Sequence, residues 1–204
     1  FSFNTGKNII NNLSLKFEKG KIYGIKGVSG SGKTTLLNLI SGLISPDSGQ
    51  ILLDGKEINN TSSAKLLNVG YVPQSVFLFD TSIAKNIHLN IKDNSENDFK
   101  KISSLIKNLD LGEKIASLSK GLHTDVGERG VNLSGGQIQR IGVARALYHD
   151  PKLLILDEAT NAIEKELEMK VLKYLNNLKQ DKIIIIVAHR ESVFESCDKV
   201  YKLS

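Results

Sequence analysis

The 204-residue sequence is poor in several kinds of residue and segment, and each shortage excludes a class of protein. It has a single Cys, Cys197, which excludes a disulfide framework and a Cys-rich zinc site. Its longest strongly apolar run covers residues 183–188, far short of the roughly 18 residues that a membrane-spanning helix needs. No signal peptide is visible. Because position 1 is Phe and the single Met is Met169, we expect the chain to be a piece of a longer protein.

The composition is that of a globular protein. Hydrophobic residues make up 40% and charged residues 24%, which excludes a disordered or collagen-like chain. The net charge of +5 forms no basic tail or block, so we interpret it as a Lys-rich solvated surface and expect no nucleic-acid partner. Arg is scarce, which indicates that it is used where a fixed fork of donors is needed. The Arg residues are Arg129, Arg140, Arg145 and Arg190.

Short apolar segments alternate with helical patterns along the chain. Residues 13–17 alternate between apolar and polar side chains, and strands are predicted at residues 21–26, 51–53, 69–72, 153–156, 183–188 and 200–203. Helices are predicted at residues 34–41, 81–89, 96–109, 137–149 and 166–178. This order favours a single α/β domain over residues 1–204 with a parallel sheet. Residues 75–150, which show no clear strand, are interpreted as a helical insertion into that domain.

A glycine-rich loop lies between the first predicted strand and helix. Residues 27–34 (GVSGSGKT) fit G-x-x-x-x-G-K-[ST], in which glycines let backbone N–H groups form an anion-binding nest at a helix N-terminus. Lys33 is expected to reach the β- and γ-phosphates, and the Thr34 hydroxyl to ligate Mg²⁺. The alternative is a glycine-rich turn followed by a chance Lys-Thr pair. The predicted phosphate-binding residues are Gly27, Val28, Ser29, Gly30, Ser31, Gly32, Lys33, Thr34 and Thr35.

An acidic pair ends a second predicted strand, at residues 153–158 (LLILDE). Asp157 lies at the carboxyl end of a core strand, where a parallel sheet places its ligand crevice, and is expected to hold Mg²⁺. Glu158 points the other way, towards an attacking water, as a general base or water-positioning group requires. The alternative is a strand that merely leaves the core through acidic residues.

A second glycine motif, residues 133–137 (LSGGQ), precedes a long predicted helix. Ser134 can cap that helix, and the glycines expose backbone N–H groups at its N-terminus. Ser134, Gly135, Gly136 and Gln137 are therefore further candidate phosphate-binding residues. One γ-phosphate needs only one cradle, so a second such site requires an explanation.

With these motifs the sequence resembles the ATP-binding cassette family over its whole length, because LSGGQ is that family's signature motif. The resemblance implies a P-loop NTPase fold with a RecA-like core and a mainly parallel sheet, an antiparallel β subdomain and a helical insertion. It also implies a head-to-tail pair of cassettes, in which the signature of one closes on the γ-phosphate held by the other. ATP is the implied substrate and Mg²⁺ the implied cofactor.

Further positions match the family in order. Gln74, in residues 71–74 (YVPQ), matches the Q-loop glutamine, which contacts Mg²⁺ and water, and His189, in residues 187–190 (VAHR), matches the switch histidine. The resemblance thus implies Glu158, His189, Gln74 and Lys33 as catalytic residues and Thr34, Gln74 and Asp157 as metal ligands. For His189 the alternative is a surface histidine at a strand end.

Adenine recognition is assigned to the start of the chain. The family stacks adenine on an aromatic residue, and the aromatic pair in residues 1–3 places Phe3 in that role. The alternative for Phe3 is a core or frayed-terminus residue.

Two segments resemble exporter-type cassettes. Residues 124–130 (TDVGERG) resemble the exporter X-loop, and residues 77–80 (FLFD) and 83–87 (IAKNI) also look exporter-like. The resemblance implies an ATPase domain of an exporter, which contacts a transmembrane domain through the Q-loop and X-loop regions. The implied location is the cytoplasmic face of a membrane, a bacterial inner membrane.

Departures from the family pattern leave other functions open. Residues 161–164 read NAIE where the family's D-loop reads SALD, and Ile138 replaces the usual Arg after the signature. These changes concern the tightness of the dimer and the rate of hydrolysis. The alternatives are a regulatory cassette with weak hydrolysis, or a soluble cassette ATPase of DNA repair or translation. Cys197 has no catalytic partners beside it and is interpreted as an inert thiol.

Overall fold

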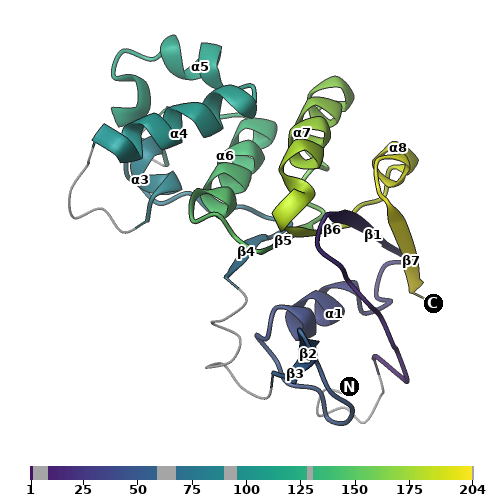
Figure 1. Ribbon diagram of the computed structural model, residues 1–204. Coiled ribbons are helices and arrows are strands. Elements are labelled where there is room, and N and C mark those ends of the chain that lie inside the picture. Colours follow the sequence, from purple (N-terminus) through teal and green to yellow (C-terminus); the bar gives the residue numbers. More distant parts are fainter. Residues whose placement is uncertain (2–8, 59–67, 90–95, 128–130, 204) are drawn as a thin grey trace.

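The computed structural model describes residue 1 and residues 9–58, 68–89, 96–127 and 131–203 (Figure 1). Within that part of the chain, no helix is both long enough and apolar enough to span a membrane. The strands are β1 (Lys21–Gly27), β2 (Leu52–Leu53), β3 (Lys56–Glu57), β4 (Val69–Val72), β5 (Leu153–Asp157), β6 (Ile183–Val187) and β7 (Lys199–Leu203). The helices are α1 (Lys33–Ile40), α3 (Ile83–Ile87), α4 (Glu96–Asn108), α5 (Gly112–Ala116), α6 (Gly135–Tyr148), α7 (Lys165–Leu178) and α8 (Glu191–Glu195), with 3₁₀ turns η2 (Gly121–His123) and η3 (Lys179–Asp181).

Five strands form one parallel sheet in the order β4-β5-β6-β1-β7. The order is not sequential because parallel neighbours must be joined by crossover connections, which here carry the helices. A separate antiparallel pair, β2 and β3, lies with α1 on one side of the sheet (Figure 1). The predicted fold class, a P-loop α/β core with a mainly parallel sheet and a small antiparallel sheet, is confirmed.

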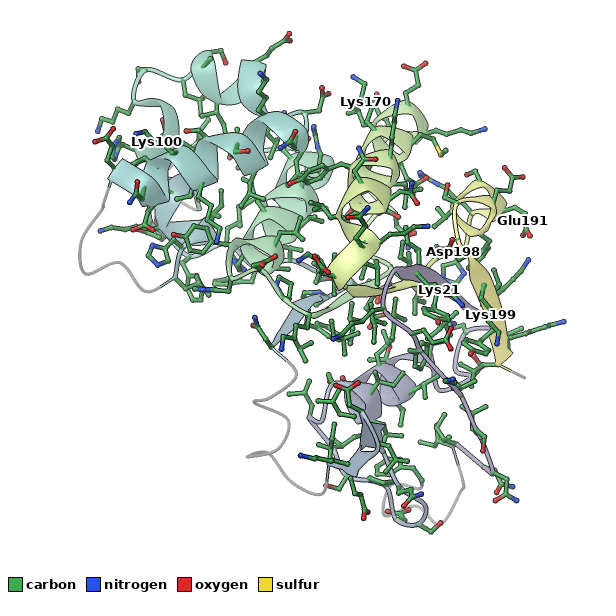
Figure 2. All side chains as sticks on the ribbon, in the orientation of Figure 1. Lys21, Lys100, Lys170, Glu191, Asp198 and Lys199 are labelled. Atoms are coloured by element: carbon green, nitrogen blue, oxygen red, sulfur yellow. The ribbon has the colours of Figure 1, made fainter. Side chains whose placement is uncertain are left out.

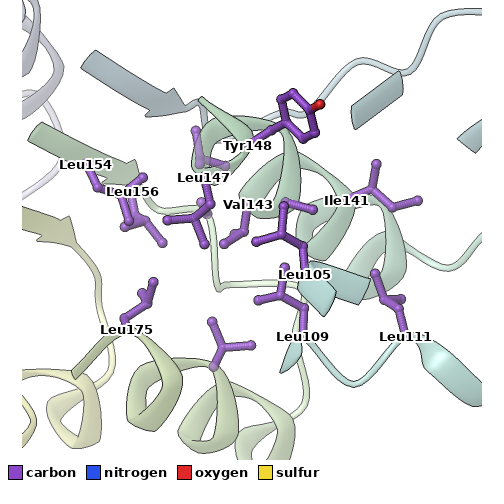
Figure 3. Packing of buried hydrophobic residues seen from close by; sticks show 14 of the residues in the cluster. Leu105, Leu109, Leu111, Ile141, Val143, Leu147, Tyr148, Leu154, Leu156 and Leu175 are labelled. Atoms are coloured by element: carbon purple, nitrogen blue, oxygen red, sulfur yellow. The ribbon is translucent and has the colours of Figure 1, made fainter. Parts of the chain in front are cut away.

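Both faces of the central strands β5 and β6 are buried, and both strands are apolar apart from Asp157 at the end of β5. Along β5, Leu154 and Leu156 pack in the same cluster as Leu147 of α6 and Leu175 of α7 (Figure 3). The alternate residues Leu153 and Ile155 belong instead to the cluster on the α1 side, with Leu36 and Leu37. The sheet therefore lies between two hydrophobic cores.

Residues 13–17, all of which the structure describes, form no strand, although apolar and polar side chains alternate along them. Phe17 packs its ring edge-on against Tyr23, with 4.9 Å between ring centroids, and Leu15 joins the same cluster. The alternation therefore reflects which side chains are buried. It does not reflect hydrogen bonding to a neighbouring strand.

Between β4 and β5 the described residues form helices, turns and isolated bridges only. Guanidinium groups hold this region together. Arg140 donates to the carbonyl oxygens of Leu109 and Asp110, and Arg145 donates to those of Asn86 and Phe77. This confirms the expected use of Arg as a fork of donors at both positions, whereas Arg129 lies outside the described residues. The boundaries of a helical subdomain at residues 75–150 stay a prediction.

Lysines are spread over many elements of the surface. Lys100 on α4 and Lys170 on α7 project from distant parts of the molecule (Figure 2), and each pairs with an exposed carboxylate. Exposed ion pairs of this kind contribute little to stability.

Helix α6 approaches β4 closely at Gly70. A Cβ atom at this position would lie 2.6 Å from the carbonyl oxygen of Ala146 and 2.9 Å from Cγ of Pro151. We expect Gly70→Ala to lower the free energy of unfolding by about 1–3 kcal/mol, because backbone atoms must move to admit the methyl group. Urea denaturation measures this change.

Gly112→Ala is the matched control, because the nearest atom to its Cβ is Cα of Lys107 at 4.0 Å. It should leave the urea midpoint unchanged or raise it slightly. A Gly70→Ala midpoint equal to that of the unsubstituted protein would contradict the close packing of α6 on β4.

Candidate functional site

The phosphate loop connects the end of β1 to the start of α1. Gly30 and Gly32 have φ angles of 78° and 87°, in the left-handed region that favours glycine. A Cβ on Gly27 would lie 2.5 Å from Oγ of Ser31 and 2.8 Å from the carbonyl oxygen of Leu203. The glycines are therefore required by backbone geometry and by close approach.

Lys33 is the first residue of α1 and is 7% exposed. Its ammonium group donates to the carbonyl oxygens of Gly27 and Val28, at 2.9 Å each. An ammonium group has three N–H donors. Two of them hold the Lys33 side chain across the loop, and the third can donate to a phosphate oxygen.

A cleft of about 820 Å³ opens above this loop. It brings together Gln74, Glu158 and His189, which are far apart in the sequence. Ile9 also lines the cleft and was not predicted from the sequence. The other lining residues are Val28, Ser29, Gly30, Ser31, Gly32, Lys33, Thr34 and Thr35. Phe3, the predicted adenine-stacking residue, lies outside the described residues.

Asp157 ends β5 next to the phosphate loop. Its Oδ2 atom accepts hydrogen bonds from Oγ1 of Thr34 at 3.2 Å and from the hydroxyl of Tyr71 at 2.9 Å. The pairing of hydroxyl and carboxylate oxygens suits Mg²⁺, which prefers hard oxygen ligands. The predicted pair of Thr34 and Asp157 therefore fits a magnesium ion.

Tyr71, which holds Asp157, is a residue that sequence reasoning missed. It lies on β4, opposite Ile155 of β5 in the register of the sheet. Burial, together with the charge of Asp157, raises the pKa of Tyr71 above its usual value, so the hydroxyl stays protonated and donates. Its place three residues before Gln74 in the YVPQ segment was the available signal.

Glu158 turns the chain sharply away from the sheet. Its φ angle is 53°, in a left-handed region that costs a non-glycine residue about 1–2 kcal/mol. Its backbone N–H donates to the carbonyl oxygen of Val187 at 3.0 Å, which fixes the turn against the end of β6. The Glu158 side chain lines the cleft.

Three side chains hold the Glu158 carboxylate. Its Oε1 atom lies 2.8 Å from Nε2 of His189, and its Oε2 atom accepts from Nε2 of Gln74 at 2.9 Å. Oε2 also accepts from Nδ2 of Asn161 at 3.1 Å, a contact that the sequence did not predict. The structure thus brings Gln74, Glu158 and His189 together as expected, while their roles in catalysis stay a prediction.

The signature motif begins α6 with a capping box. The Ser134 hydroxyl accepts from the backbone N–H of Gln137, and the Gln137 side chain accepts from the backbone N–H of Ser134. A Cβ on Gly136 would lie 2.9 Å from the carbonyl oxygen of Ala162, so only glycine lets this helix end pack on residues 161–164. None of the described residues that line the cleft belongs to the signature segment.

Comparisons with known proteins agree with this geometry. Residues 10–161 match the family model described as ABC transporter. The chain is 38% identical over 199 residues to an ATP-dependent lipid A-core flippase of Ralstonia nicotianae, covering 97% of this chain and 34% of that protein. It is 43% identical over 195 residues to the ABC-type transporter atr1 of Mycosarcoma maydis, covering 94% of this chain and 14% of that protein.

A solved structure gives the same answer. The fold superposes with a TM-score of 0.89 on the structure of a bacterial Atm1-family ABC exporter with ATP bound, at 32% identity. That similarity covers 100% of this chain and 36% of the exporter chain. The chain belongs to the ABC transporter family, whose ATP-binding domain it matches. It spans about a third or less of the length of these relatives.

Removal of the Tyr71 hydroxyl should weaken Mg²⁺ binding in this site. In Tyr71→Phe the Asp157 carboxylate loses its anchor on β4, and such supporting contacts typically change metal affinity about 10-fold or more. We expect the Mg²⁺ concentration that half-saturates MgATP binding to rise by about that factor. ATP binding in EDTA should not change. Titration of a fluorescent ATP analogue with Mg²⁺ measures both quantities.

Tyr174→Phe is the control, since Tyr174 is a half-buried tyrosine of α7 outside the cleft. It should leave the Mg²⁺ titration as it is. Equal Mg²⁺ dependence in Tyr71→Phe and the unsubstituted protein would show that the Tyr71 hydroxyl does not support the metal site.

Cys197 should react slowly in the folded protein. Burial, with a smaller effect from the charge of Asp198, raises the pKa of its thiol to about 11. The reactive thiolate is therefore scarce at pH 8, and reaction with a thiol reagent should be about 100-fold slower than in urea. Stopped-flow measurement with a disulfide reagent tests this, and native and unfolded rates within tenfold of each other would contradict it.

Proposed function

We propose that this chain is the ATP-hydrolysing cassette of an exporter and that it works as one of a head-to-tail pair. The observation that carries the proposal is the Glu158 carboxylate, which is held by Gln74, Asn161 and His189 and lines the phosphate-loop cleft. A carboxylate fixed in this way can polarise a water molecule that approaches the phosphate end of a nucleotide.

The chain's own groups supply the chemistry of hydrolysis. Water attacks the γ-phosphorus, its proton passes to Glu158, and the bond from the γ-phosphorus to the ADP oxygen breaks. Lys33 and the backbone N–H groups of the loop stabilise the charge that gathers on the phosphate oxygens. His189 lies beside Glu158, and in the proposed mechanism it would contact the γ-phosphate. Mg²⁺, held by Thr34, Asp157 and Gln74, would neutralise phosphate charge when bound.

The second cassette supplies the other half of each site. The signature helix offers backbone N–H groups and Ser134, Gly135 and Gly136 at a capped N-terminus, which is suited to an anion. Among the described residues this helix end does not line its own chain's cleft, so it is available for the γ-phosphate that the proposed partner cassette would hold.

The exporter assignment rests on the relatives and on one surface. The matched proteins include a lipid A-core flippase and an ABC exporter. Phe77 and Phe79, 69% and 49% exposed, follow Gln74 and form a T-shaped pair, and Ser82, three residues after Phe79, forms a bridge with Asp125 of the X-loop segment. This apolar surface is the proposed contact with a transmembrane domain at the cytoplasmic face of a membrane, in bacteria the inner membrane.

One observation favours a second candidate, a regulatory cassette with weak hydrolysis. Glu164 stands where the family has Asp, and it is the N-cap residue of α7 but makes no side-chain capping bond. Asp caps helices well because its short side chain reaches the first-turn N–H groups. ATPase rate measured against protein concentration separates the candidates, since the proposed pair predicts cooperative turnover that depends on dimer formation.

Replacement of Glu158 should stop turnover and retain binding. In Glu158→Gln the amide cannot accept the proton from water, so kcat should fall by about 100-fold or more. ATP should still bind, and the protein should elute from size-exclusion chromatography as an ATP-dependent dimer. A phosphate-release assay measures the rate.

Glu195→Gln is the control, because Glu195 is an exposed glutamate at the end of α8. Its turnover should match that of the unsubstituted protein. Normal turnover in Glu158→Gln would remove Glu158 from the mechanism.

A further inference from the structure

Arg190 follows His189 directly and ties three segments together. Its Nη1 atom donates to the carbonyl oxygen of Ile163 at 2.9 Å and to Oε2 of Glu168 at 2.9 Å. Its Nη2 atom donates to the carbonyl oxygen of Asn161 at 3.1 Å. One planar guanidinium thus joins the loop after β6, the loop after β5 and helix α7.

Glu168 anchors this guanidinium. Its side chain is 0% exposed and lies in the first turn of α7, where the helix dipole favours a negative charge. Among the described residues, Arg190 is the cation paired with Glu168. The Oε1 atom of Glu168 has no hydrogen-bond partner among the described residues. A buried carboxylate needs its charge partner, so Arg190 is fixed in position from the α7 side.

The loop held by Arg190 contacts the Glu158 carboxylate. Asn161, whose carbonyl oxygen accepts from Arg190, donates its side-chain amide to Oε2 of Glu158. His189, the residue before Arg190 in the chain, contacts Oε1 of the same carboxylate. Two of the three side chains that hold Glu158 therefore belong to segments that Arg190 joins.

We propose that Arg190 is a positioning residue for ATP hydrolysis: anchored by Glu168, it fixes Asn161 and His189 and thereby the orientation of Glu158. The consequence for turnover rests on the function proposed above, whereas the clamp on the loop does not. Arg190 touches neither the cleft nor the predicted phosphate site, so its effect passes through Glu158.

Amide hydrogen exchange tests the clamp independently of turnover. Lys at position 190 keeps the charge next to Glu168 but lacks the planar fork. In Arg190→Lys, and in Glu168→Gln, we expect the amides of Asn161, Ala162 and Ile163 to exchange about fivefold or more faster. Arg145→Lys is the matched control, because Arg145 also holds backbone carbonyls but on α3 and residue 77. Unchanged exchange in both clamp variants would overturn the proposal.

Turnover tests the consequence. Arg190→Lys should lower kcat by about 10- to 100-fold through misplacement of Glu158, while KM for ATP stays within about twofold. In a Glu158→Gln background the same substitution should change the residual single-turnover rate less than about twofold, because the residue it acts through is gone. An equal fold-decrease in rate in both backgrounds, or a rise in KM with no change in kcat, would overturn the positioning role. Absence of ATPase activity in the unsubstituted protein would instead refute the proposed function and leave the exchange result standing.

Discussion

The parallel pairing of β1, β5 and β6 is the constraint on which the rest of the site depends. Parallel strands end at the same edge of a sheet, so the phosphate loop after β1, the acidic pair at the end of β5 and His189 after β6 all lie at that edge. The backbone bond from Glu158 to Val187 then fixes the turn at this edge. Glu158 adopts a left-handed conformation at that turn. The conformation is tolerated because Glu158 is held by the sheet through its backbone and by the side chains of Gln74, Asn161 and His189.

Much of the fold could be predicted from the sequence, because strands buried on both faces are continuous apolar runs. β5 and β6 are such runs, and both were located within a residue of their bounds. Alternation alone does not identify a strand: Leu15 and Phe17 pack against the core from residues 13–17, a segment that pairs with no strand among the described residues. The short elements β3, α5 and α8 carry too few residues for a periodic signal, and packing decides them.

The candidate site divides in the same way. Lys33, Asp157 and Glu158 could be predicted, because each lies in a contiguous motif whose residue types indicate phosphate or Mg²⁺ binding or water activation. Tyr71 and Asn161 could not be found in that way, because common residue types reveal a role only through contacts made in the folded chain. Asn161 was noticed only as a departure from a family pattern, yet it donates directly to Glu158. The scarcity of Arg was a better guide, since each described guanidinium holds backbone carbonyls.

The tight contact of Gly136 with Ala162 has a consequence for a pair of such cassettes. In the proposed arrangement the Gly136 end of α6 faces the partner's nucleotide, while Asn161 faces the nucleotide of its own chain. With no room for even a methyl group between them, the helix end and the loop are in direct backbone contact, and we expect them to move together. A displacement of the loop at one nucleotide would therefore shift the helix end at the other nucleotide. Hydrolysis at the two sites of the pair would then be coupled and not independent.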